Sequence, residues 1–131
     1  MPQASSLQTS NGPACTPSTQ VAAARLLVQT LLRSPEARRR WQRHATRRRP
    51  GLHQAAVCQV LARHLWSTGQ EPPWDTQLPR RLKDRVSRAL SGTGLGPSTL
   101  RLFIDAFELD AATEDRLWAA LWGMTDRDRP D

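Results

Sequence analysis

The chain has 131 residues and a formal net charge of +7, with 24% charged and 5% aromatic residues. This length supports one domain with tails, and no apolar run reaches membrane-spanning length or forms a signal peptide, so no membrane partner is expected. Cys15 and Cys58 lie in unlike contexts, which gives no disulfide framework and predicts a cytoplasmic protein.

The positive charge is concentrated in two blocks. Residues 25–49 carry +8 and residues 80–101 carry +5, whereas residues 102–131 carry −5. Clustered cations attract polyanions, and nucleic acid is the commonest of these. All but one of the basic residues are Arg, a skew that often follows from GC-rich coding. The clustering, rather than the arginine count, therefore carries the argument.

The first segment of the chain, residues 1–17, is polar, uncharged and without apolar periodicity, and we expect a disordered tail there. A helical domain is expected over residues 18–123, and its first part, 18–49, is predicted to form basic helices. Thr16 or Ser18 can cap the first of them. Its apolar stripe consists of Val21, Ala24, Leu27, Val28, Leu31 and Leu32.

A second helix is predicted to begin at Ser34, because a capping serine is followed there by proline and glutamate. Beyond it the apolar stripe is thin, and Trp41 is its one large member. Three interpretations stay open for the arginines around it: a solvated helix face, pairing with acidic residues, or a nucleic-acid contact. Trp41 either docks on the core or stacks on a base. The arginines concerned are Arg38, Arg39, Arg40 and Arg43.

A third helix is predicted over residues 52–66, after a break at Pro50 and Gly51. The residues available to the core are Leu52, Ala55, Ala56, Val60, Leu61 and Leu65. The set His53, Cys58 and His64 matches no zinc spacing, because position 58 projects about 140° away from position 53 on a straight helix. No metal site and no cofactor are predicted.

Residues 67–79 are predicted to be a loop, because the segment contains three prolines and a glycine. Trp74 is its one large apolar residue. It either pins the loop onto the domain or presents a contact to a partner.

Residues 80–123 are predicted to form a three-helix unit, followed by a frayed tail at 124–131. The first helix runs over 80–90, and Gly92 is expected as its left-handed C-cap. The second begins at Pro97, and the third begins between Asp110 and Thr113. The apolar stripes of the three are Leu82, Val86 and Leu90; Leu100, Phe103, Ile104 and Phe107; and Leu117, Trp118, Leu121 and Trp122.

Together these elements predict an all-α fold, an orthogonal bundle of five or six short helices with a disordered N-terminal tail. None of the helices is long enough to be stable alone in water, so their stripes are expected to face one another. The glycines between residues 92 and 96 follow no strand and precede no lysine, so they form no phosphate-binding fingerprint. No catalytic set is recognisable, and the chain is not expected to be an enzyme.

Residues 86–88, Val-Ser-Arg, are followed by Gly92, by the Pro97-Ser98 helix start, and then by Leu100, Ala106 and Leu109. This pattern resembles the second half of lambda-repressor-like, Xre-type helix-turn-helix domains of small bacterial regulators. The resemblance covers roughly a third of the chain. It implies DNA binding in transcription regulation, usually by a homodimer. The side chains that it implies at or near the groove are Arg81, Lys83, Asp84, Arg85, Ser87 and Arg88.

One feature departs from that family. Its recognition helix follows the preceding helix after a tight turn, whereas the whole of residues 67–79 intervenes here. The alternative function is therefore a helical protein–protein interaction module without nucleic-acid activity.

Overall fold

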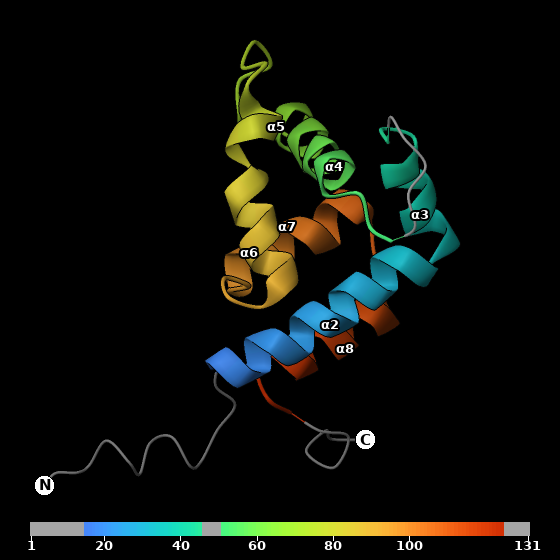
Figure 1. Cartoon of the computed structure of the whole chain (residues 1–131), viewed down its shortest axis with the longest axis vertical. Coiled ribbons are helices and arrows are strands. Elements are labelled where there is room, and N and C mark those ends of the chain that lie inside the picture. The colour runs from blue at the N-terminus through green and yellow to red at the C-terminus, as the bar shows by residue number, and fades with distance from the viewer. Residues whose placement is uncertain (1–14, 46–50, 125–131) are drawn as a thin grey trace, which may run out of the picture.

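The structure is a computed structural model, and it describes residues 15–45 and 51–124. Within these ranges the fold is all-α, as the sequence predicts, and no strand is present (Figure 1). The helices are α2 (Pro17–Arg33), α3 (Pro35–Gln42), α4 (Gln54–Ser67), α5 (Leu78–Arg81), α6 (Lys83–Ser91), α7 (Pro97–Phe107) and α8 (Ala111–Leu121). The tails predicted at 1–17 and 124–131 lie almost wholly outside the described residues.

Helix α7 is the centre of the bundle. Phe103 and Phe107 are both almost completely buried, and their rings stack with centroids 6.3 Å apart. Leu102 and Ala106 are buried as well, so α7 is covered on more sides than the stripe predicted from its sequence. A helix that is apolar around most of its circumference is stable only inside a core.

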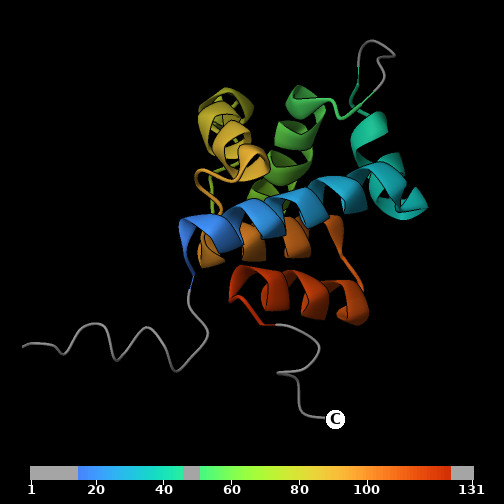
Figure 2. The same cartoon turned by 60° about the horizontal axis from the view of Figure 1, so that its bottom comes forward.

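Helices α2 and α8 lie side by side along one edge of the bundle, and both views agree on this (Figures 1 and 2). Leu27, Leu31, Leu117 and Leu121 are fully buried. Helix α2 also packs against α3 and α6, while α4 packs against α3, α5, α6 and α7. Thus α4 separates α3 on one flank from α5 and α6 on the other (Figures 1 and 2).

Local signals set the helix boundaries. The Thr16 hydroxyl accepts a hydrogen bond from the backbone N–H of Thr19 at 3.2 Å, and the Asp110 carboxylate accepts one from that of Thr113 at 3.0 Å. Gly92 is the predicted left-handed C-cap, with a φ of +87°. A Cβ there would lie 2.7 Å from the Cα of Val21, so the close approach of α2 also requires glycine.

The single helix predicted over residues 80–90 is wrong. The chain forms α5 and α6 instead, and Leu82 between them has φ −81° and ψ −10°. Leu82 and Val86 are buried as expected, but Leu90 is half-buried. The apolar residues keep their four-residue spacing across the break between α5 and α6, so the apolar pattern does not reveal this break.

Several predicted core residues lie at the surface. Trp74 is 79% exposed and does not pin the loop, and Val21 is 37% exposed. Ala55 is exposed, while Trp118 and Trp122 are only half-buried at the rim of α8. For the residues of the predicted helices, the apolar stripe expected from the sequence is wider than the surface that the neighbouring helices cover.

Candidate nucleic-acid interface

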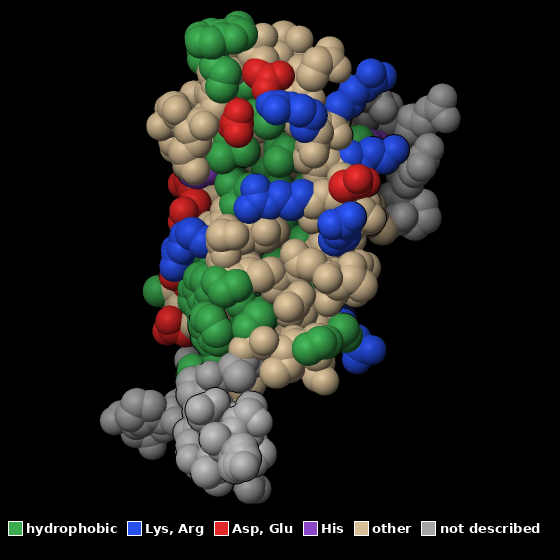
Figure 3. All heavy atoms as spheres, turned by 90° about the vertical axis from the view of Figure 1, so that its left-hand side faces the viewer, with side chains coloured by type: hydrophobic (Ala, Val, Ile, Leu, Met, Phe, Trp, Pro, Cys, Tyr) green, Lys and Arg blue, Asp and Glu red, His purple; other side chains and the backbone are tan. Residues whose placement is uncertain are grey.

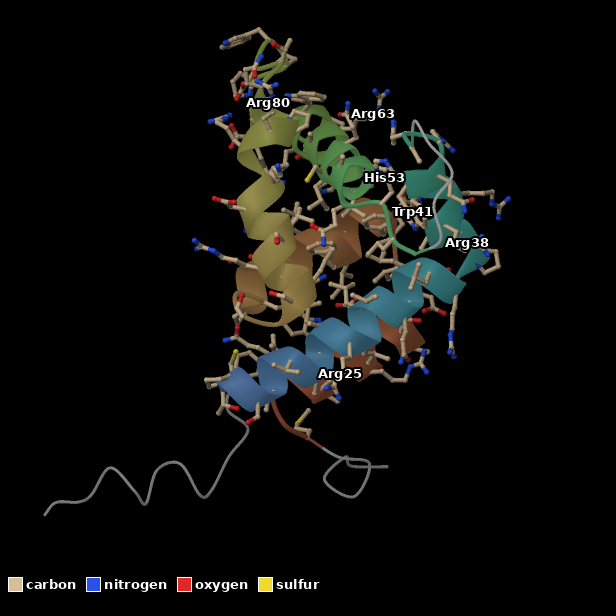
Figure 4. All side chains as sticks on the ribbon, in the orientation of Figure 1. Arg25, Arg38, Trp41, His53, Arg63 and Arg80 are labelled. Atoms are coloured by element: carbon tan, nitrogen blue, oxygen red, sulfur yellow. The ribbon has the colours of Figure 1, made fainter. Side chains whose placement is uncertain are left out.

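Helix α3 is held against α2 by Trp41. The Ser34 hydroxyl accepts a hydrogen bond from the backbone N–H of Ala37 at 3.3 Å and so starts the helix directly after α2. Trp41 is 4% exposed, and its Nε1 donates to the carbonyl oxygen of Leu31 at 2.8 Å (Figure 4). Trp41 therefore docks on the core. Base stacking by this residue is excluded in this conformation.

Docked in this way, α3 forms one wall of an open cavity of about 500 Å³, which we call the basic cleft. Helix α4 forms the opposite wall, and Ala106 of α7 contributes to the lining. The lining residues are Arg40, Arg43, His44, Val60, Arg63, His64, Trp66, Ser67 and Ala106. Cationic and imidazole groups thus surround a partly apolar floor.

The positive charge of the cleft is only partly compensated. Arg40 Nη2 lies 2.9 Å from Glu108 Oε2. Arg43 and Arg63 have no ion-pair partner among the described residues. Burial, and then the charges of Arg63 and Arg43, lower the pKa of the His44 imidazole below its ordinary value of 6.5. The unpaired guanidinium groups of Arg43 and Arg63 give the cleft a positive potential, which favours an anionic ligand.

The other predicted residues of α3 lie outside the cleft lining. Arg38 is exposed and points away from the bundle (Figure 4). Arg39 is exposed, and its Nε donates to the carbonyl oxygen of Pro35 at 3.4 Å. Both extend the basic surface along the outer face of α3.

On the opposite flank of α4, two of the predicted site residues are engaged within the fold. Arg81 forms an ion pair with Asp75, and its Nη2 also lies 3.7 Å from Glu71 Oε1. Arg85 Nε donates to the hydroxyl of Thr99 at 3.1 Å, and Thr99 is buried. These guanidinium groups therefore have structural roles, which the sequence pattern did not indicate.

The remaining predicted residues of α6 are Lys83, Ser87 and Arg88, and all three are exposed. Basic and acidic side chains alternate on this side of the molecule (Figure 3). Asp84 is exposed here too. The positive surface of α5 and α6 is therefore more dilute than that of the basic cleft.

The structure does not combine the two predicted basic blocks into one site, because α4 lies between them (Figures 1 and 2). Helices α4 and α6 do pack against each other. They are joined by residues 68–77 and α5, and not by the tight turn of the helix-turn-helix family. The 68–77 loop projects from the bundle beside the start of α5 (Figure 1).

Other candidate chemical groups are accounted for locally. His53 Nδ1 accepts a hydrogen bond from the backbone N–H of Ala56 at 3.1 Å and caps α4. Burial raises the pKa of the Cys58 thiol, which keeps it neutral. Among the described residues, no His, Cys, Asp or Glu side chains are grouped so that they could hold a metal ion. No described helix combines the length and apolarity that a membrane crossing requires.

Three members of the cleft were not predicted from the sequence: His44, Arg63 and His64. Arg63 lies in a segment whose net charge is slightly negative, so charge blocks do not reveal it. The available signal was helical spacing, because Val60, Arg63 and Ser67 recur along one side of α4. Comparison with known protein families, curated proteins and solved structures finds no match to this chain.

Proposed function

We propose that this chain binds DNA, and that the basic cleft between α3 and α4 holds backbone phosphates. The observation that carries the proposal is the convergence of Arg43, the C-cap residue of α3, and Arg63 of α4 on a cavity with His44 and His64. Neither arginine has a carboxylate partner in the described part of the chain. Guanidinium groups donate two parallel hydrogen bonds to a phosphate, which suits them to this role.

Helix α6 offers a second contact in this proposal. Lys83, Ser87 and Arg88 are exposed and free to reach phosphates or base edges. The 68–77 loop projects beside the start of α5 (Figure 1), and in helix-turn-helix proteins it is the N-terminal part of the recognition helix that contacts the bases. Because this loop restricts the approach of α6 to a groove, we assign the larger share of the binding energy to the cleft. A regulatory role like that of helix-turn-helix proteins would require side chains of α6 to select a DNA sequence. The proposed function includes no catalytic step.

The test is a fluorescence-anisotropy titration with a labelled DNA duplex at several salt concentrations. Each phosphate contact contributes a slope of about −0.9 to the plot of log affinity against log salt. Arg43→Ala combined with Arg63→Ala should weaken binding and make that slope shallower by about 1.8. A flat slope for the parent chain would refute the proposal.

The matched control is Arg25→Ala combined with Arg116→Ala, which removes the same charge from α2 and α8. Both arginines are exposed and outside the cleft. If the control loses as much affinity as the cleft variant, binding depends on net charge alone and the assignment of the cleft is wrong. A third variant, Lys83→Ala with Arg88→Ala, measures the share of α6.

A second candidate function is a protein-interaction module, and Trp74 is the observation that favours it. This side chain is 79% exposed on a projecting loop, although large aromatic side chains are normally well covered. In that case the parent chain would bind the duplex weakly and without selectivity, and the cleft variants would change no specific binding.

A further inference from the structure

The 68–77 loop has a fixed shape that presents Trp74. Asp75 forms an ion pair with Arg81, and its Oδ1 accepts a hydrogen bond from the backbone N–H of Gln77 at 3.2 Å. The backbone N–H of Asp75 donates to the carbonyl oxygen of Pro72 at 3.0 Å, and that of Glu71 donates to Leu65 at 3.1 Å. A loop ordered in advance loses little conformational entropy on binding.

The loop complements the basic cleft in chemistry. It carries one exposed indole and two carboxylates, Glu71 and Asp75, which share the single guanidinium of Arg81. The cleft has an apolar floor that includes Val60 and Ala106, and its walls carry more positive charge than Glu108 compensates. An indole stacks favourably on guanidinium planes, and carboxylates pair with them.

The loop and the cleft also lie next to each other in the chain. Trp66 and Ser67 line the cleft, and the loop begins at the next residue. Trp74 nevertheless remains exposed, so the loop does not fill the cleft of its own chain. A two-fold axis beside this end of the molecule would place each loop opposite the cleft of a second copy, which is how a self-complementary interface is built.

We propose that two copies of this chain associate reciprocally, with Trp74 of each inserted into the basic cleft of the other. The cavity of about 500 Å³ is large enough to receive an indole ring. Two buried tryptophans contribute about 150–250 Å² each, which is less than a standard interface buries, so the dimer is expected to be weak and to form only at high protein concentration. The proposal assigns the cleft a second ligand, and it rests on the same charges as the proposed DNA contact.

Sedimentation equilibrium of the full chain without nucleic acid tests the proposal. The parent chain should form a dimer and no larger species. Trp74→Ala should weaken the dimer at least tenfold, while Val21→Ala, at the other large apolar residue that is exposed in the described part of the chain, should not. Arg63→Glu should also weaken it, with its fold checked by circular dichroism. A monomeric parent, larger oligomers, or an unaffected Trp74→Ala variant would overturn the proposal.

Mixing the two variants sharpens the result. Trp74→Ala keeps an intact cleft and Arg63→Glu keeps an intact loop, so a heterodimer retains one whole contact. The mixture should therefore form dimer at concentrations where neither variant does alone, and failure to do so refutes reciprocal docking.

The DNA titration separates this inference from the proposed function. Because the second copy would occupy the cleft, Trp74→Ala should bind the duplex at least as tightly as the parent. Weaker binding by Trp74→Ala would instead assign Trp74 to a nucleobase and overturn the dimer. Loss of DNA binding in the variant that combines Arg43→Ala with Arg63→Ala tests only the proposed function, and not the dimer.

Discussion

Two arginine-containing regions of this molecule use the same side chain in opposite ways. At the junction of α7 and α8, Arg101 Nη1 lies 3.2 Å from Asp105 Oδ1, and its Nη2 lies 2.7 Å from Glu114 Oε2. Its guanidinium carbon also lies 5.3 Å from the centroid of the Trp118 ring. In the basic cleft, by contrast, Arg43 and Arg63 face a cavity without a carboxylate partner within the described ranges.

The two regions differ in the carboxylates that lie near their arginines. Asp105 stands one helical turn after Arg101 and Glu114 lies on the adjoining helix, so the charge is neutralised where it arises. The acids of the chain are concentrated after residue 101, whereas α3 lies in the basic block. Paired arginines contribute to the fold, and unpaired ones are left for a ligand. Four changes test this contrast.

The largest expected effect is on the wall of the cleft. Trp41→Ala removes a nearly buried side chain and its hydrogen bond to Leu31, so it should destabilise the fold by about 3–5 kcal/mol. Chemical denaturation measures the change. Trp74→Ala serves as the control, because that indole is exposed and its loss should leave the midpoint nearly unchanged. Equal effects of the two changes would mean that α3 is not anchored by Trp41.

A smaller effect is expected for the paired arginine. Arg101→Ala should cost about 1 kcal/mol, since it removes two partly exposed ion pairs and a cation–π contact. Arg43→Ala should cost less than about 0.5 kcal/mol, as expected at a surface position without a partner. A larger loss for Arg43 than for Arg101 in thermal melting would reverse the comparison.

This contribution of Arg101 should depend on pH. Its hydrogen bond to Glu114, and that of Trp118, hold the pKa of the Glu114 carboxyl below its ordinary value of 4.5. A carboxyl whose pKa is lower in the folded state stabilises the fold above the unfolded value and loses that contribution as the pH falls through the folded one. The difference in stability between parent and Arg101→Ala should therefore shrink below pH 4.5.

The two arginines of α6 provide a third test. Arg85→Ala should cost about 0.5–1 kcal/mol, because it leaves the buried Thr99 hydroxyl without its hydrogen-bond donor. Arg88→Ala should change stability by less, since Arg88 is exposed like Arg85 but its side chain makes no hydrogen bond or ion pair with the described residues. Unfolding curves of the two single variants give the comparison. Indistinguishable curves would show that the bond to Thr99 contributes nothing.

The smallest effect is a change in titration. In the cleft, burial and the charges of Arg63 and Arg43 lower the pKa of His44. Arg63→Ala should therefore raise that pKa toward 6.5, and added DNA duplex should raise it as well, whereas Arg116→Ala on α8 should not. NMR titration of the imidazole protons measures all three. An unchanged His44 in Arg63→Ala would mean that the cleft is screened by solvent.

The lowered pKa of His44 also sets the direction in which the stability of the fold changes with pH. Because its pKa is lower in the folded than in the unfolded state, the unfolded chain binds the proton more readily near pH 6. Its unfavourable contribution is thus absent well above pH 6.5 and appears as the pH falls through that value.

Local sequence signals were enough to predict most of the helices. Thr16, Ser34, Pro97 and Asp110 all stand at helix starts, and Gly92 ends α6 as expected. Such signals depend on hydrogen bonds within a few residues, so they can be read directly from the sequence.

The cleft could not be read in the same way. Its walls carry Arg43 at the end of α3 and Arg63 on α4, and their approach depends on how Trp41 docks α3. The exposure of Trp74 likewise depends on a loop path that no periodicity encodes. Arg85 was expected to face a groove, yet its partner Thr99 lies across a turn on the next helix. Tertiary geometry decides each of these cases.

Helices α2 and α8 run side by side, and α2 begins close to the end of α8, at the side of the bundle away from the 68–77 loop (Figures 1 and 2). The described part of the chain is therefore entered and left at one pole, while Trp74 stands at the other. A partner or solid support that contacts the side where α2 begins and α8 ends would therefore leave the 68–77 loop and Trp74 accessible.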